Sequence, residues 1–117
     1  MSETTYDLFQ LGRARLREGM AAQATVPLEK AKKREPRKAS IREALGIAYF
    51  RIRRYAEAET EFRAVIDIAP TEPYAHYALG RCLEKLGRDT EAQGHYKLAS
   101  VFEPTSERYR ERVRKQA

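Results

Sequence analysis

The chain repeats itself at a fixed step of 34 residues, and this period limits its fold more than any other feature of the sequence. A Leu-Gly pair, an alanine and a proline each return three times at that step. The recurring residues are Leu11-Gly12, Leu45-Gly46 and Leu79-Gly80, then Ala24, Ala58 and Ala92, then Pro36, Pro70 and Pro104. A step of this size is typical of stacked helical units, each of which covers its apolar face with the next one. Such arrays generally offer a surface to another molecule, so the period favours binding over catalysis.

The recurring residue types indicate how two helices pack within one unit. A glycine inside a helix costs roughly 1 kcal/mol relative to alanine, so three such glycines predict close approach of a second helix. We expect the recurring alanine to lie at that crossing, small residue against small residue. Apolar residues four and seven positions after each alanine complete a buried helical stripe. They are Leu28 and Ala31, Phe62 and Val65, and Tyr96 and Ala99. The proline ends each unit, because it cannot continue a helix.

These marks resemble the tetratricopeptide repeat over about residues 5–104, nearly the whole chain. The resemblance implies an all-α fold, a right-handed superhelical solenoid of three helix-turn-helix repeats with a C-terminal capping helix. One domain over residues 1–117 is expected, with repeats at about 5–38, 39–72 and 73–106. We expect helices at about 5–18, 22–34, 39–52, 55–68, 73–86, 89–101 and 106–116. In the last of these, Tyr109 and Val113 form an apolar pair on an otherwise charged, solubilising helix.

The first unit departs from the pattern at two positions. Pro27 falls inside its expected second helix, where the missing N–H predicts a kink or a late helix start. Arg15 stands where the later units have Tyr49 and Leu83, a position that is normally apolar. Either the Arg15 stem lies along apolar surface with its head in water, or this end of the stack contacts something else.

The resemblance also implies a concave groove, lined by the first helix of each repeat, as the ligand site. Its residues are commonly the second, fifth, ninth and thirteenth of each unit. Here they are Tyr6, Phe9, Arg13, Arg17, Ser40, Glu43, Ile47, Arg51, Tyr74, Tyr77, Arg81 and Lys85. This strip is aromatic toward one end and basic toward the other, so it would suit a peptide with apolar and acidic side chains.

A structural explanation stands beside each part of this strip. Arg17, Arg51 and Lys85 lie in the last turns of their expected helices, where the helix dipole alone favours a cation. Tyr74 and Tyr77 could pack against neighbouring helices instead of facing a ligand. The hypothesis of a site depends on the coincidence of these residues in one strip.

Some members of this family are co-chaperones that grip a chaperone's C-terminal carboxylate with Lys, Asn, Asn, Lys and Arg. The corresponding positions of this chain hold Phe9, Arg13, Ala44, Tyr74 and Ala78. Only Arg13 could serve, as a substitute. We therefore do not expect that specialised activity, and a general peptide or partner-protein groove remains.

The net charge of +6 is concentrated at the two ends of the chain. Residues 1–38 hold nine Lys and Arg against five Asp and Glu, and residues 105–117 hold five against two. Cations near helix C-termini are favoured by the helix dipole, which explains these clusters without a ligand. Nucleic-acid binding through the basic termini is the alternative function, and its affinity would fall steeply with salt.

Other classes of function find little support. No apolar run is long enough to span a membrane, and Met1 to Asp7 lacks the pattern of a secretory signal. A single cysteine, Cys82, fits a reducing, cytoplasmic compartment and a small buried residue. His76 and His95 have no further ligand at metal-binding spacing, and no Gly-rich loop could hold phosphate. We therefore expect no enzyme, no metal and no cofactor.

The sequence thus predicts a non-catalytic scaffold that binds a peptide or partner protein in the concave groove. An assembly factor or a chaperone-like adaptor would fit this description. Self-association is a variant, because an open-ended stack can dock onto a second copy.

Overall fold

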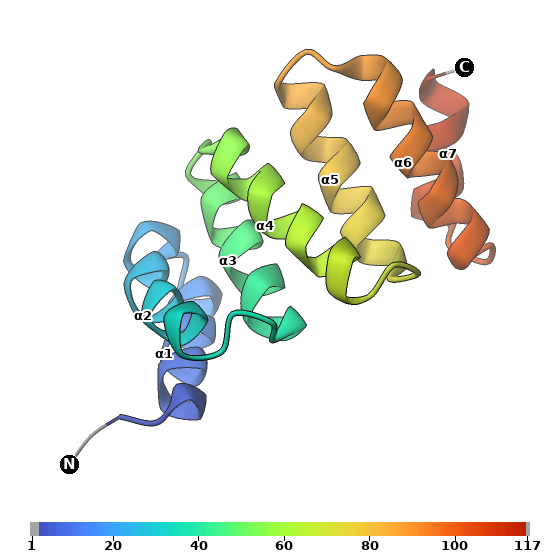
Figure 1. Cartoon of the computed structure of the whole chain (residues 1–117). Coiled ribbons are helices and arrows are strands. Elements are labelled where there is room, and N and C mark those ends of the chain that lie inside the picture. Colours follow the sequence, from blue (N-terminus) through green and yellow to red (C-terminus); the bar gives the residue numbers. More distant parts are fainter. Residues whose placement is uncertain (1–2, 117) are drawn as a thin grey trace.

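The computed structural model describes residues 3–116, which form seven α-helices and no strand (Figure 1). The helices are α1 (Thr5–Arg17), α2 (Ala21–Arg34), α3 (Ala39–Arg51), α4 (Tyr55–Ile68), α5 (Pro73–Lys85), α6 (Asp89–Phe102) and α7 (Glu107–Gln116). Successive helices pack against each other in an elongated array of about 53 × 24 × 21 Å. The predicted all-α helical-repeat fold is confirmed, and each observed helix end lies within one residue of its expected position.

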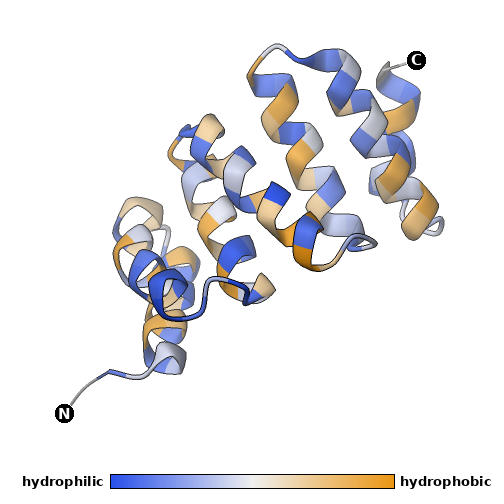
Figure 2. Ribbon diagram, viewed as in Figure 1, coloured by the Kyte–Doolittle hydropathy of each residue, from blue (hydrophilic) through white to orange (hydrophobic). Residues whose placement is uncertain are grey.

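The recurring glycine allows close approach of the two helices in a unit, as predicted, and the side chain nearest to it is the bulky residue of the stripe. A Cβ atom on Gly12 would lie 2.4 Å from the Leu28 side chain. At Gly46 the clash would be with the Phe62 ring, at 2.8 Å. The bulky residue of the stripe therefore fills the space beside the glycine. Figure 2 shows that apolar and polar residues alternate along the ribbon of each helix.

Pro27 does not delay the start of its helix. The second helix begins at Ala21 and continues through Pro27 to Arg34, so the predicted late start is wrong. Proline lacks the N–H that would donate to the backbone oxygen of Gln23, four residues earlier. Arg15 Nη1 donates to that oxygen instead, at 2.9 Å. The head of Arg15 is thus bound to α2, which neither of the two expectations for this residue included.

The unit's fourth position, counted from Thr5, Ala39 and Pro73, joins neighbouring units. Arg42 Nε donates to the backbone oxygen of Pro36 at 2.8 Å, and Arg42 Nη1 also pairs with the buried Glu61 at 3.0 Å. In the next unit His76 takes the same position, with Nε2 2.8 Å from the backbone oxygen of Pro70. The backbone oxygens of Pro36 and Pro70 are thus each bound by the side chain of the fourth residue in the following unit.

The C-terminal helix α7 covers the end of the array. Tyr109 is buried there and Val113 packs against the core, which confirms the apolar pair expected on this helix. Glu84 on α5 fastens it, because one carboxylate oxygen accepts hydrogen bonds from Arg112 at 2.9 Å and from the Tyr96 hydroxyl at 2.5 Å.

Cys82 lies fully buried within the core of the array. Burial raises the pKa of its thiol to about 12, so the thiol stays protonated at neutral pH. This agrees with the expectation of a small core residue. Among the residues that the structure describes, no helix is long and apolar enough to cross a membrane.

Candidate functional site

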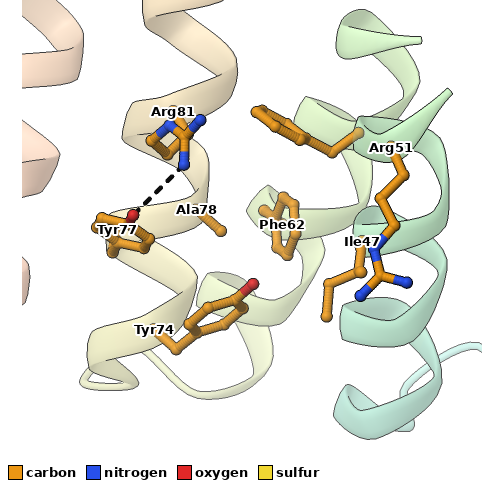
Figure 3. Close-up of a pocket in the computed structure, with 8 residues that line it drawn as sticks. Ile47, Arg51, Phe62, Tyr74, Tyr77, Ala78 and Arg81 are labelled. Carbon is orange, nitrogen blue, oxygen red and sulfur yellow. Dashed lines mark hydrogen bonds between the residues drawn. The ribbon is translucent and has the colours of Figure 1, made fainter. Parts of the chain in front are cut away.

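Two adjoining hollows run along the inner faces of α1, α3 and α5. The first has a volume of about 380 Å³ and lies between α1 and α3. Its lining consists of Phe9, Arg13, Leu16, Arg17, Ser40, Glu43, Ala44, Ile47 and Arg51. The second, of about 150 Å³, lies between α3, α4 and α5 (Figure 3). It is lined by Ile47, Phe50, Arg51, Phe62, Tyr74, Tyr77, Ala78 and Arg81. Because Ile47 and Arg51 line both hollows, the two form one groove, and we call these residues together the groove.

The structure brings most of the expected strip to this surface. Ten of the twelve expected residues line the groove, and the exceptions are Tyr6 and Lys85. Tyr6 is 66% exposed in the first turn of α1, and Lys85 is exposed at the end of α5. This result concerns position only, and the role of these residues in binding stays a prediction.

The predicted strip did not include five residues of the groove, which are Leu16, Ala44, Phe50, Phe62 and Ala78, although Ala44 and Ala78 were already among the positions compared with the carboxylate-gripping residues. Four of them share a signal, because Leu16 and Phe50 are the twelfth residues of their units while Ala44 and Ala78 are the sixth. Phe62 could not be found this way. It belongs to the second helix of its unit and reaches the hollow through the space that Gly46 leaves open.

The second hollow has an aromatic wall. Phe62, which is only 1% exposed, meets the Tyr74 ring edge-on, with centroids 6.3 Å apart. Tyr77 follows at 6.1 Å from Tyr74 and also packs against Tyr109 of α7 at 5.2 Å. The Tyr77 side chain is therefore part of the core as well as of the groove, which is the structural explanation considered above for this residue.

Four arginines line the groove without forming an ion pair to any residue that the structure describes. They are Arg13, Arg17, Arg51 and Arg81. Three of them are held by other contacts. Arg13 lies over the Phe9 ring at 5.5 Å and Arg81 over the Phe50 ring at 5.1 Å. Arg51 Nη1 donates to the backbone oxygen of Leu16 at 2.9 Å. The charge of Glu84 acts on Arg81, but none of the four forms an ion pair with a described carboxylate, so each can pair with a carboxylate of a ligand.

Glu43 is the only carboxylate that lines the two described hollows. Burial raises the pKa of its side chain above the usual range, and the negative charge of Glu72 raises it further. Glu43 lies in the first half of α3, whereas Arg51 is the last residue of that helix. The groove is therefore cationic toward the C-terminal ends of its helices, and its one acid lies toward the other end.

Some of the basic residues at the two ends of the chain form ion pairs. Lys32 pairs with Glu61 at 3.0 Å and Arg37 with Asp67 at 3.3 Å. In α7 the ion pairs are Arg110 with Glu107, Arg112 with Glu84, and Arg114 with both Glu107 and Glu111. These five cations have structural partners, whereas Lys30, Lys33 and Lys38 are exposed and form no ion pair with a residue that the structure describes.

His76 and His95 come together in the third unit, although they are nineteen residues apart in the sequence. Their Nδ1 atoms lie 3.1 Å apart and their rings stack. Within residues 3–116 no group of three or more His, Cys, Asp or Glu side chains is placed to hold a metal ion.

The paired helices and the concave lining define a helical-repeat protein. Two sequence models of the tetratricopeptide repeat family match the chain, one over residues 9–73 and the other over residues 53–112. The chain belongs to the tetratricopeptide repeat family. A search of curated protein sequences gave no match.

Solved structures with the same fold include binding domains and a longer repeat protein. The first tetratricopeptide domain of Spaghetti (RPAP3), bound to the HSP90 peptide SRMEEVD, is 21% identical, with a TM-score of 0.92 over 99% of this chain and 92% of that chain. The first such domain of human RPAP3 is 20% identical, with a TM-score of 0.88 over 96% and 88%. MamA from Desulfovibrio magneticus RS-1 is 21% identical, with a TM-score of 0.92 over 97% of this chain and 64% of that chain. At these identities the likeness establishes the fold.

Proposed function

We propose that the groove binds an acidic, extended segment of a partner protein and that the chain is a non-catalytic interaction scaffold. The observation that carries this proposal is the set of four groove arginines without a carboxylate partner. Eight arginines outside the groove form ion pairs, as Arg63 does with Glu59 at 2.8 Å and Arg88 with Glu91 at 2.8 Å. A ligand that supplies carboxylates would form the same kind of ion pair with the groove arginines.

The structural neighbours support a peptide ligand in general terms. RPAP3 binds an acidic HSP90 peptide in its tetratricopeptide domain. In this chain, however, the positions of the carboxylate-gripping residues hold Phe9, Arg13, Ala44, Tyr74 and Ala78. A groove that lacks those lysines and asparagines would recognise acidic side chains along the segment rather than its free C-terminus. An assembly factor or adaptor role fits such recognition.

The test uses two double variants that change the net charge equally. Arg13→Glu/Arg17→Glu reverses two exposed charges inside the groove, and Lys30→Glu/Lys33→Glu reverses two exposed charges on α2, outside it. Each variant and the original protein are immobilised and used to capture proteins from a lysate of the source cell. We expect partners that bind the original protein and the Lys variant to be lost from the Arg variant. Equal capture by all three would show that the groove is not the binding surface.

Nuclease treatment of the lysate distinguishes binding of a protein in the groove from the alternative function, nucleic-acid binding through the basic termini. If capture required nucleic acid, it would disappear after nuclease treatment, and the Lys variant would reduce it as much as the Arg variant. A protein partner bound in the groove would survive the nuclease.

A further inference from the structure

The second hollow of the groove has an apolar floor and two arginines at its rim. Ile47 and Phe50 are half-buried, so each keeps surface that faces the hollow, while Phe62 closes the floor. The volume of about 150 Å³ is that of a cavity known to take up a benzene molecule when its lining is apolar. A side chain of phenyl or leucyl size would therefore fill the hollow and bury its apolar surface.

The rim places positive charge on two sides of this hollow. Figure 3 shows Arg51 projecting from α3 and Arg81 from α5, with Ile47, Phe62 and Tyr74 between them. Both guanidinium groups are held in place by neutral partners. Arg51 donates through one nitrogen to the backbone oxygen of Leu16. Arg81 lies over the Phe50 ring and donates to the Tyr77 hydroxyl at 3.4 Å. Because these contacts already fix the side chains, binding a carboxylate would cost them less conformational entropy.

We propose that the second hollow is an anchor site for one apolar side chain of the bound segment, with an Asp or Glu beside it that pairs with Arg51 or Arg81. This inference rests on the proposed function and specifies its ligand. An extended chain advances about 3.3 Å per residue, so a carboxylate one or two residues from the anchor can reach the rim. The recognised pattern is thus an apolar residue next to an acidic one, and acidic residues alone would bind more weakly.

A random dodecapeptide library displayed on phage provides an unbiased probe of this pattern. The library is selected on the original protein, on Ile47→Glu, which puts a carboxylate into the hollow, and on Leu98→Glu. Leu98 is 38% exposed on α6 and outside the groove, so it gives a matched control. We expect the original protein and the control to enrich peptides with Phe, Leu or Met next to Asp or Glu, and Ile47→Glu to lose them. Ile47→Thr is a milder variant if circular dichroism shows that Ile47→Glu does not fold.

The most enriched peptide is then synthesised with its apolar anchor replaced by Ser. We expect this peptide to bind the original protein at least tenfold more weakly, whereas Leu98→Glu should bind the unchanged peptide within twofold of the original protein. If the enriched peptides were acidic but indifferent to the anchor and to Ile47, the anchor site would be wrong and the groove function would stand. If the enriched peptides bound both Ile47→Glu and Arg13→Glu/Arg17→Glu as well as they bind the original protein, both proposals would fail.

Discussion

The Nδ1 atoms of His76 and His95 face each other at 3.1 Å, in a contact that allows only one arrangement of protons for the neutral pair. His76 Nε2 lies 2.8 Å from the backbone oxygen of Pro70, which can only accept, so this nitrogen carries the hydrogen. The neutral His76 ring therefore accepts at Nδ1, and His95 must donate from its own Nδ1. An added proton on His76 would set two N–H groups against each other.

The histidine pair should make the stability of the array depend on pH. Burial lowers the pKa of His95, and the neighbouring His76 and Arg63 lower it further. Because the folded-state pKa lies below the unfolded value of about 6.5, the unfolded chain binds more protons as the pH falls through that value. The contribution to stability is complete above about pH 7 and is lost as the pH falls toward the folded-state pKa.

Urea unfolding at pH 7.5, 6.5 and 5.5 measures this dependence. We expect the free energy of unfolding to fall over this range in the original protein and to fall less in His95→Gln, whose amide can still donate to His76. Carboxylates titrate in both proteins, so their effect cancels in the difference. Identical pH slopes would mean that the histidine pair does not couple protonation to folding.

The contact between Arg15 and α2 should stabilise the first unit only because Pro27 is present. With proline at that position the Gln23 oxygen lacks its helical donor, and Arg15 supplies one at 2.9 Å. Replacing Arg15 with Met keeps the stem and removes the donor, and we expect a loss of about 1 kcal/mol. In the Pro27→Ala background the alanine N–H donates to the Gln23 oxygen. Arg15→Met should therefore lower the free energy of unfolding much less in that background. A double-mutant cycle by chemical denaturation gives the coupling, and additive effects would contradict it.

The 34-residue period was enough to place the helices, and the resemblance to the tetratricopeptide repeat placed most of the groove on them. A fixed register predicts a helix end wherever proline or a glycine turn returns, and it assigns the same face to equivalent residues such as Arg13, Ile47 and Arg81. Each helix end was within one residue of its expected position for this reason. Residues that line the groove from equivalent positions were also predictable.

The remaining features depend on contacts between residues far apart in the register. The donor for the Gln23 oxygen comes from Arg15 on another helix, and no local pattern links the two. Phe62 reaches the groove from a second helix because Gly46 leaves room, which depends on the crossing of α3 and α4. For Tyr77 the sequence left ligand contact and helix packing both open, and the packing of α7 against the third unit explains why it is 8% exposed.

Gly46→Ala should destabilise the array although alanine is the better helix former. The added Cβ would lie 2.8 Å from the Phe62 ring, and the ring is fully enclosed, so either the ring or one of the helices must shift. Overpacking of this kind costs about 1–3 kcal/mol, which exceeds the gain of roughly 1 kcal/mol from removing a helical glycine. Phe62→Leu in the same chain should recover part of the loss, because the shorter side chain leaves room for the methyl group.

Gly94→Ala is the matched control for this prediction. Gly94 lies inside α6, and a Cβ there would meet no atom within 4 Å, so only the helix propensity changes. We expect Gly94→Ala to raise the free energy of unfolding by about 0.5–1 kcal/mol. Thermal and urea unfolding of both variants therefore give changes of opposite sign. If Gly46→Ala also stabilised the protein, the close approach of α3 and α4 at Phe62 would not be what retains glycine at this position.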